Sequence, residues 1–250
     1  MTDYTIAESY TLPSLGKVYS ETINPHVKIR SMTVEEEMKR LAPSDRPYKM
    51  LSEIIDDCLI EKPGISAYDL CVGDYQFLLH KLRVVTYGPD YKIITTCPYC
   101  GNKETSVINL EDLSVKAYSE DIEKYKEFVL PRSNKKIRIR MQTPRLLDDV
   151  TVKVQDFKKK ATSFVGDPAF LFTLESLIES IDDKPVNPLN IQEFIRKLPM
   201  MDTNFIIKNA QKLDEGVGLN TAIELKCSDC GLEYPATFRT TAEFFGPSID

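Results

Sequence analysis

Two short stretches decide the fold expected for this chain: ITTCPYCGNKETSVINL, from Ile94 to Leu110, and IELKCSDCGLEYPATF, from Ile223 to Phe238. Each contains two cysteines separated by two residues, with a glycine directly after the second cysteine. The residues on either side are rich in β-branched and apolar types, which favour strands. We therefore expect each stretch to form a strand, a tight turn and a second strand.

The four cysteines of these stretches form the ligand set for one metal ion: Cys97, Cys100, Cys227 and Cys230. Structural Zn²⁺ sites take four tetrahedral ligands, and thiolates suit them well. Gly101 and Gly231 are free to adopt positive φ, so the chain can reverse directly after the second cysteine of each pair. Backbone N–H groups in such turns can point at the sulfurs and offset their charge. The sequence predicts one structural Zn²⁺ held by two facing hairpins, which is a zinc ribbon, and the motif occurs twice because the metal needs both halves.

Redox chemistry and a catalytic metal are other roles that paired cysteines can take. A redox C-x-x-C motif needs only one pair, at a helix start that a glycine after the second cysteine fits poorly. A catalytic Zn²⁺ keeps an open position and usually includes histidine or carboxylate, and His26 and His80 both lie far from the motifs in sequence. Cys58 and Cys71 sit in apolar contexts, where a cysteine behaves as a small buried hydrophobic residue.

Composition is that of a soluble globular protein of 250 residues, with 42% hydrophobic and 28% charged residues and a net charge of −6. No apolar run approaches the roughly 20 residues of a membrane span. The start, MTDYTIAESYTLPSLGKVY, lacks a basic segment followed by an apolar one, so we expect no signal peptide. A cytoplasmic location is therefore expected, where paired cysteines more often hold metal than form disulfides. The basic runs FKKKA and SNKKIRIR are short, and we interpret them as solvated faces.

The fold class expected is α+β, in three parts. Residues 1–90 form an N-terminal arm and helical region, residues 91–112 and 219–250 form the split zinc ribbon, and residues 113–218 form an inserted, mostly helical subdomain. Thr33 and Glu36 make a capping-box pattern at a helix start. Further helices are expected within 47–61 and 74–88, and at about 144–163, 168–181, 189–198 and 202–214. A hairpin is expected to turn at Ser133–Asn134, and residues 182–188 are expected to form a loop.

The chain shows no G-x-G-x-x-G, no Walker-type phosphate loop, no H-E-x-x-H and no G-x-S-x-G. The acidic pairs Asp56–Asp57, Asp148–Asp149 and Asp182–Asp183 are expected on solvated helix faces or turns, where adjacent acids point in different directions. We therefore expect that the protein is not an enzyme and that it has neither a catalytic residue nor a small-molecule substrate.

Three segments carry a resemblance to a known family: LPSLGKVY near the start, LLHKLRVVTYGPDYKIITTCPYCG in the middle and LKCSDCGLEYPATFRTTAEFF at the end. In this order they resemble the baseplate hub assembly proteins of T-even-like tailed bacteriophages. The resemblance implies a non-enzymatic role in building the central hub of a contractile tail, as an assembly chaperone or an incorporated subunit. It also implies that the four paired cysteines are zinc ligands and that the partners are other tail and hub proteins. The expected location is the host cytoplasm during assembly, with the virion baseplate as the alternative.

Two segments are candidate partner surfaces. Phe244 and Phe245 would anchor in a partner's pocket or close the protein's own core, and YTLPSLGKVYSE would lie along a neighbour or form a strand edge. A nucleic-acid-binding or transcription-associated zinc ribbon is the alternative function, with Tyr99 stacking on a base. The net negative charge of the chain argues against nucleic-acid binding, because contacts with phosphate need Lys and Arg. No membrane partner is expected.

Overall fold

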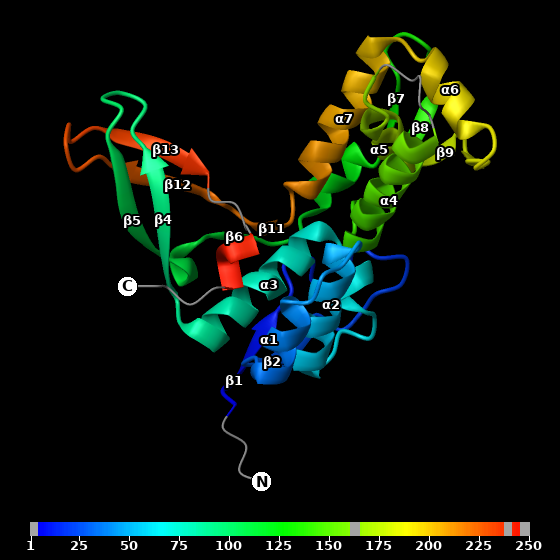
Figure 1. The fold of residues 1–250 in the computed structure, drawn as a ribbon. Helices are drawn as coiled ribbons and strands as arrows, with labels where there is room; N and C mark the ends of the chain where they lie inside the picture. The colour runs from blue at the N-terminus through cyan, green and yellow to red at the C-terminus, as the bar shows by residue number, and fades with distance from the viewer. Residues whose placement is uncertain (1–4, 161–165, 238–241, 246–250) are drawn as a thin grey trace.

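The computed structural model describes residues 5–160, 166–237 and 242–245. Figure 1 shows an N-terminal body from which two arms diverge, one made of two long hairpins and the other mostly helical. The chain leaves the body through the first hairpin, builds the helical insert and returns through the second hairpin, and Phe244 and Phe245 then pack against the body. The predicted α+β class is confirmed. None of the described helices combines the length and the apolar character that crossing a bilayer requires.

The body packs helices on a small antiparallel sheet of order β1-β2-β3. Its elements are β1 (Ala7–Thr11), β2 (His26–Arg30), α1 (Val34–Arg40), α2 (Pro47–Cys58), β3 (Leu59–Glu61) and α3 (Val72–Tyr87). The predicted capping box begins α1: Thr33 Oγ1 accepts the N–H of Glu35, and Glu36 Oε2 accepts the N–H of Thr33 at 2.7 Å. Gly88, with φ of 89°, ends α3 as expected from its position.

The first arm consists of two antiparallel hairpins from distant parts of the chain. They are β4 (Asp90–Thr96) with β5 (Lys103–Asn109), and β12 (Ala222–Lys226) with β13 (Glu233–Thr237). The registers pair Thr96 with Lys103 and Lys226 with Glu233, so each cysteine pair lies in the turn of its hairpin. This confirms the prediction of a strand, a turn and a strand at both motifs.

The insert contains a four-stranded antiparallel sheet of order β10-β9-β8-β7 and a group of helices. Its elements are β7 (Glu127–Val129), β8 (Lys136–Ile139), α4 (Pro144–Lys160), α5 (Ala169–Leu177), β9 (Ile178–Ile181), β10 (Lys184–Pro185), α6 (Ile191–Lys197) and α7 (Met200–Asp214). Two further strands, β6 (Val115–Lys116) and β11 (Gly218–Leu219), pair at its base. The β7–β8 hairpin confirms the predicted turn at Ser133–Asn134.

Three local predictions were wrong. The expected helix over 168–181 ends at Leu177, and the helix within 47–61 ends at Cys58. In both places the following residues pair as strands, Ile181 with Ile137 and Leu59 with Ile29. Tertiary pairing therefore overrides the local helical pattern. The expected loop over 182–188 includes the two residues of β10, which pair with β9.

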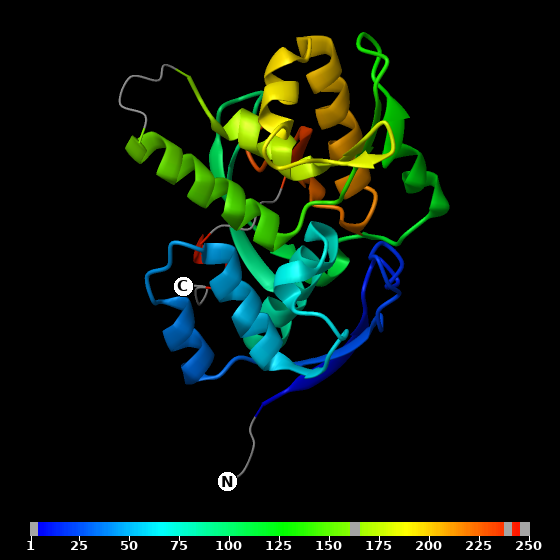
Figure 2. The same cartoon turned by 90° about the vertical axis from the view of Figure 1, so that its right-hand side faces the viewer.

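The body, the arm of two hairpins and the insert meet where the start of α3 crosses β11. A Cβ built on Gly73 would lie 2.2 Å from the carbonyl oxygen of Val217, and Gly218 has φ of +120°. Two backbones can approach this closely only where neither carries a side chain. Figure 2 shows the insert stacked above the body, with the loop after β1 rising to meet it. The N–H of Tyr118 donates to the carbonyl of Pro13 in that loop, at 2.8 Å.

Candidate metal centre

The four predicted ligands come together at the tips of the two hairpins: Cys97, Cys100, Cys227 and Cys230. Their sulfurs all lie within 4.8 Å of one another. Across the two hairpins, the Sγ atoms of Cys97 and Cys230 are 3.8 Å apart and those of Cys100 and Cys227 are 3.6 Å apart. Neither hairpin supplies more than two of the four sulfurs.

These distances fit a tetrahedral metal. A Zn–S bond of about 2.3 Å in a regular tetrahedron places neighbouring sulfurs about 3.8 Å apart. The two distances across the hairpins agree with this value to within a few tenths of an ångström. Four sulfur ligands leave no open coordination position for a substrate, which is the property of a structural site. The cluster therefore has the number of ligands, and across the two hairpins the spacing, of a site for one metal ion.

The turns are built by the glycines, as expected. Gly101 and Gly231 have φ of 76° and 72°, in the left-handed region. Their N–H groups donate to the carbonyl oxygens of Cys97 and Cys227, each at 3.0 Å. With the chain reversed in this way, the first cysteine of each pair is buried and the second is exposed. The same turn conformation thus occurs twice, and it aims both sulfurs of a turn to one side.

Backbone N–H groups point at three of the sulfurs. The N–H of Cys230 and that of Asp229 lower the pKa of the Cys227 thiol to about 7. The N–H of Asn102 acts in the same direction on Cys100, but burial and the neighbouring thiols outweigh it and raise that pKa to about 12. The N–H of Leu232 likewise donates to the sulfur of Cys230. These donors offset part of the negative charge that four thiolates bring to a metal.

A set of hydrogen bonds between the hairpins supports the cluster, and sequence reasoning missed it. Glu104 of β5 accepts the N–H and the hydroxyl of Ser228 at 3.1 and 2.5 Å. The hydroxyls of Thr95 and Tyr234 lie 2.8 Å apart. Tyr234 is buried with Cys97 and Cys227 in a small core of its own. A carboxylate three residues after the glycine of one motif, and a serine inside the other, were the only signals of this contact in the sequence.

The other cysteines and the histidines stand apart from the cluster. Cys58 and Cys71 are buried in the body and at its junction with the insert, as expected for small hydrophobic residues. His80 is 2% exposed, and its ring centroid lies 4.8 Å from that of Phe244. His26 lies on β2, where its Nδ1 is 3.3 Å from the hydroxyl of Thr11.

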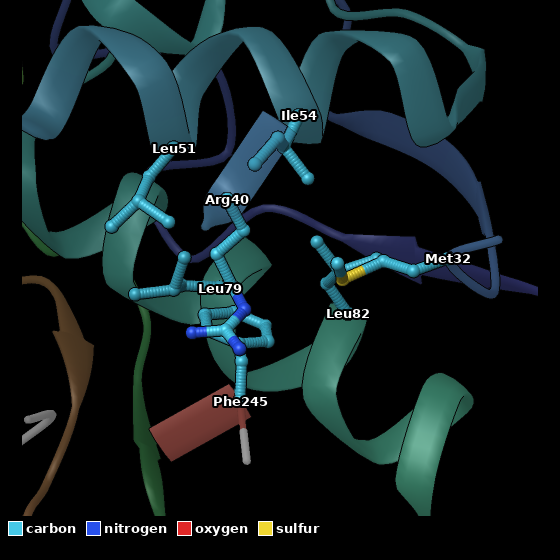
Figure 3. A pocket seen from close by; sticks show the side chains of 7 residues that line it. All are labelled: Met32, Arg40, Leu51, Ile54, Leu79, Leu82 and Phe245. Atoms are coloured by element: carbon cyan, nitrogen blue, oxygen red, sulfur yellow. The ribbon is translucent and has the colours of Figure 1, made fainter. Parts of the chain in front are cut away.

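The candidate partner surfaces belong to the protein's own body. Phe244 and Phe245 are 0% and 3% exposed, so the second of the two interpretations, closure of the core, is correct. Figure 3 shows Phe245 in a pocket lined by side chains of α1, α2 and α3, with Arg40 reaching in from α1. The segment after β1 is fixed as well, because Asp74 accepts the N–H of Ser14 at 2.9 Å and the hydroxyl of Tyr19 at 2.6 Å.

One acidic side chain corrects the expectation of solvated acids. Asp148 is fully buried, and its carboxylate accepts the N–H of Lys49 at 2.8 Å and the hydroxyl of Tyr68 at 3.1 Å. It thereby satisfies a free amide in the first turn of α2, which belongs to a different part of the chain. Its neighbour Asp149 pairs with Arg46 at 2.7 Å. This pair fastens the insert to the body.

The fold and the cluster together define an α+β protein in which four cysteines from two distant hairpins come together in an arrangement that is compatible with a zinc ribbon and could hold a metal ion. A family model described as T4 bacteriophage base plate protein matches residues 4–246. The chain belongs to this family of T4-like phage baseplate proteins, as the resemblance predicted. Comparison with curated proteins and with solved structures gives no match.

Proposed function

We propose that the protein acts without catalysis in assembling the baseplate hub, as an assembly chaperone or as an incorporated hub subunit. The observation that carries this proposal is the family match over nearly the whole chain. The hub role itself comes from the resemblance of the three quoted segments. Its partners are other tail and hub proteins, and it acts in the host cytoplasm during assembly, with the baseplate as its final location if it is incorporated.

The metal is proposed to be one structural Zn²⁺ held by the four clustered cysteines. Support comes from the sulfur spacing, from the all-thiolate ligand set and from the N–H groups directed at the sulfurs. The bound ion would cross-link the two hairpins and would take no part in catalysis. The division into a body (1–90), a split ribbon (91–112 and 219–250) and an insert (113–218) is likewise proposed as the set of units that the ion holds together.

The surface of α1 supports a role in protein association. Val34, Met38 and Leu41 recur on one side of this helix and are 75%, 68% and 67% exposed. Polar residues face the body instead: Glu36 is buried and bonds to Arg30 at 2.8 Å. In this helix the apolar side chains face solvent and the ion-paired side chains face the body. Such an exposed apolar surface is typical of a site that another protein covers.

Co-expression with the hub proteins of the same phage, followed by size-exclusion chromatography, tests the proposed function. The protein should migrate with at least one of them, and mass spectrometry of purified virions should then distinguish a chaperone from an incorporated subunit. Elution as a free monomer in the presence of every hub protein would contradict the proposal.

Nucleic-acid binding is the alternative from another class of function. Tyr99 is 60% exposed at the tip of the first hairpin, where a base could stack on it. Salt-dependent binding of a DNA or RNA oligonucleotide, lost on Tyr99→Ala, would favour this alternative.

A further inference from the structure

A cleft of about 500 Å³ lies where the body meets the insert. It is bordered by the loop after β1, the start of α3, strand β8 and the first turn of α4. Segments far apart in sequence therefore contribute to one concave surface, and that surface does not include the metal cluster.

Positive charge predominates among the side chains of this cleft. Arg138 lies on β8 between the buried Ile137 and Ile139, and Arg140 follows directly after the end of the strand, so the exposed arginines alternate with the buried isoleucines. Arg145 and Lys126 add two further cations, against two carboxylates. The chain as a whole carries a net charge of −6, which makes a positively charged cleft unusual in it.

Most of these charges have partners of their own. Arg145 bonds to Asp69 at 2.6 Å, Arg138 to Glu179 at 3.2 Å and Lys126 to Glu123 at 2.7 Å. Arg140 differs: its exposed side chain makes no hydrogen bond or ion pair with any residue that the structure describes. Among the described residues, no carboxylate forms an ion pair with this guanidinium in the cleft.

We propose that this cleft binds a carboxylate-bearing segment of a neighbouring baseplate protein, with Arg140 as the central contact. The proposal rests on the proposed function for the identity of the partner. Guanidinium groups bind carboxylates through two parallel N–H···O bonds, so the chemistry of Arg140 selects such a ligand. The ion pairs of Arg138 and Arg145 are about half exposed, and exposed ion pairs contribute little to stability, so an incoming carboxylate can replace either acidic partner at little cost.

The amount of charge favours an acidic protein segment over nucleic acid. A nucleic acid would bring many phosphates and would need a matching number of cations. Here Asp69 and Glu179 line the same cleft beside its four cations, so the lining carries an excess of only two positive charges, which is few for a phosphate backbone. One or two carboxylates match the excess charge, and the cleft is large enough for a few residues of a chain.

Fluorescence anisotropy with a labelled peptide, Gly-Asp-Glu-Asp-Glu-Gly, tests the inference on the full-length protein. Its amide counterpart, Gly-Asn-Gln-Asn-Gln-Gly, controls for charge. Arg140→Glu should weaken binding of the acidic peptide at least tenfold, whereas Arg140→Lys should weaken it less. The matched control is Lys158→Glu, which makes the same charge change at the far end of α4, about 20 Å along the helix. This control should change the affinity less than twofold.

Three results would overturn the inference: equal binding of the two peptides, equal loss in Arg140→Glu and Lys158→Glu, or tighter binding of a single-stranded oligonucleotide than of the acidic peptide. Because Arg140 is exposed, Arg140→Glu should keep the thermal midpoint of the parent protein. The experiments distinguish failure of the cleft assignment from failure of the proposed function. If the peptide does not bind but the protein still migrates with a hub protein, only the cleft assignment falls, and if no hub protein migrates with it, the proposed function falls.

Discussion

At the scale of single residues, Phe244 has the most consequential position in the body. It is fully buried, it packs against His80, Tyr91 and Phe245, and its carbonyl accepts the Nε–H of Arg83 at 2.9 Å. Arg83 is itself buried and also donates to the carbonyl of Gly88 at 3.1 Å. A buried guanidinium without a carboxylate is tolerated here because backbone carbonyls satisfy its donors.

Phe244→Ala should therefore destabilise the protein strongly. Loss of a buried phenylalanine typically lowers the free energy of unfolding by about 3–5 kcal/mol. Phe170→Ala is the matched control, because Phe170 is 42% exposed and should cost far less. Urea unfolding measures both variants. Equal effects would show that Phe244 does not belong to the core.

Two titratable residues, the buried His80 and the half-buried Asp214, should have opposite effects on stability as pH changes. Burial lowers the pKa of His80 to about 4 from 6.5, so its contribution is present above pH 6.5 and is lost as pH falls toward 4. That loss amounts to about 3 kcal/mol. Burial raises the pKa of Asp214 to about 7 from 3.8, so its contribution is present below pH 3.8 and is lost as pH rises through 7.

Single substitutions should separate the two contributions. Asp214→Asn should make the free energy of unfolding fall more steeply than in the parent protein when pH is lowered from 7 to 5. His80→Met should make it fall less steeply, or rise. Urea titrations at pH 5, 6 and 7 measure this, and comparison with the parent protein cancels any release of metal. Parallel profiles for all three proteins would contradict the assignment.

At the scale of elements, the start of α3 depends on the absence of a side chain at Gly73. Alanine in place of glycine usually stabilises a helix by about 0.5–1 kcal/mol. Here its Cβ would lie 2.2 Å from a backbone oxygen of Val217, and overpacking of this kind costs about 1–3 kcal/mol. The steric cost is the larger effect.

Gly73→Ala should consequently lower the midpoint of urea unfolding rather than raise it. It should also speed hydrogen exchange in β11, which packs on that turn. A raised midpoint would mean that helix propensity outweighs the contact with Val217.

Some elements could be predicted from sequence because their determinants are local. The capping box at Thr33 and the two cysteine turns depend on residues within a few positions of each other. The strands β3 and β9 could not be predicted, because each exists only through pairing with a distant strand. For the same reason Asp148 and Glu104 were missed: their partners lie in other elements, and no local pattern shows that the chain brings them together.

At the scale of the whole molecule, the cluster joins two hairpins between which the entire insert is built. In the loop-entropy picture, a cross-link that closes a loop of roughly 100 residues stabilises the folded state by about 5 kcal/mol. A metal held by both hairpins acts as such a cross-link. The body keeps a larger core of its own, so we expect the effect of metal loss to concentrate in the hairpins and the insert.

Cys227→Ser should reduce the metal content from one zinc per chain to none and lower the free energy of unfolding by several kcal/mol. Cys58→Ala is the control, because Cys58 is buried far from the cluster and its loss should leave the metal in place. Elemental analysis and urea unfolding measure the two effects. Full zinc content in Cys227→Ser would show that the sulfur cluster is not the binding site.

The order of the ligands along the chain has a consequence for synthesis. The first pair is complete at residue 100, but the second is complete only at residue 230 of 250. A ribosome must therefore have passed residue 230 before all four donors exist, and a product terminated before the second hairpin would lack half of them. Retention of the ion would then distinguish chains that extend through the second hairpin from fragments that stop before it.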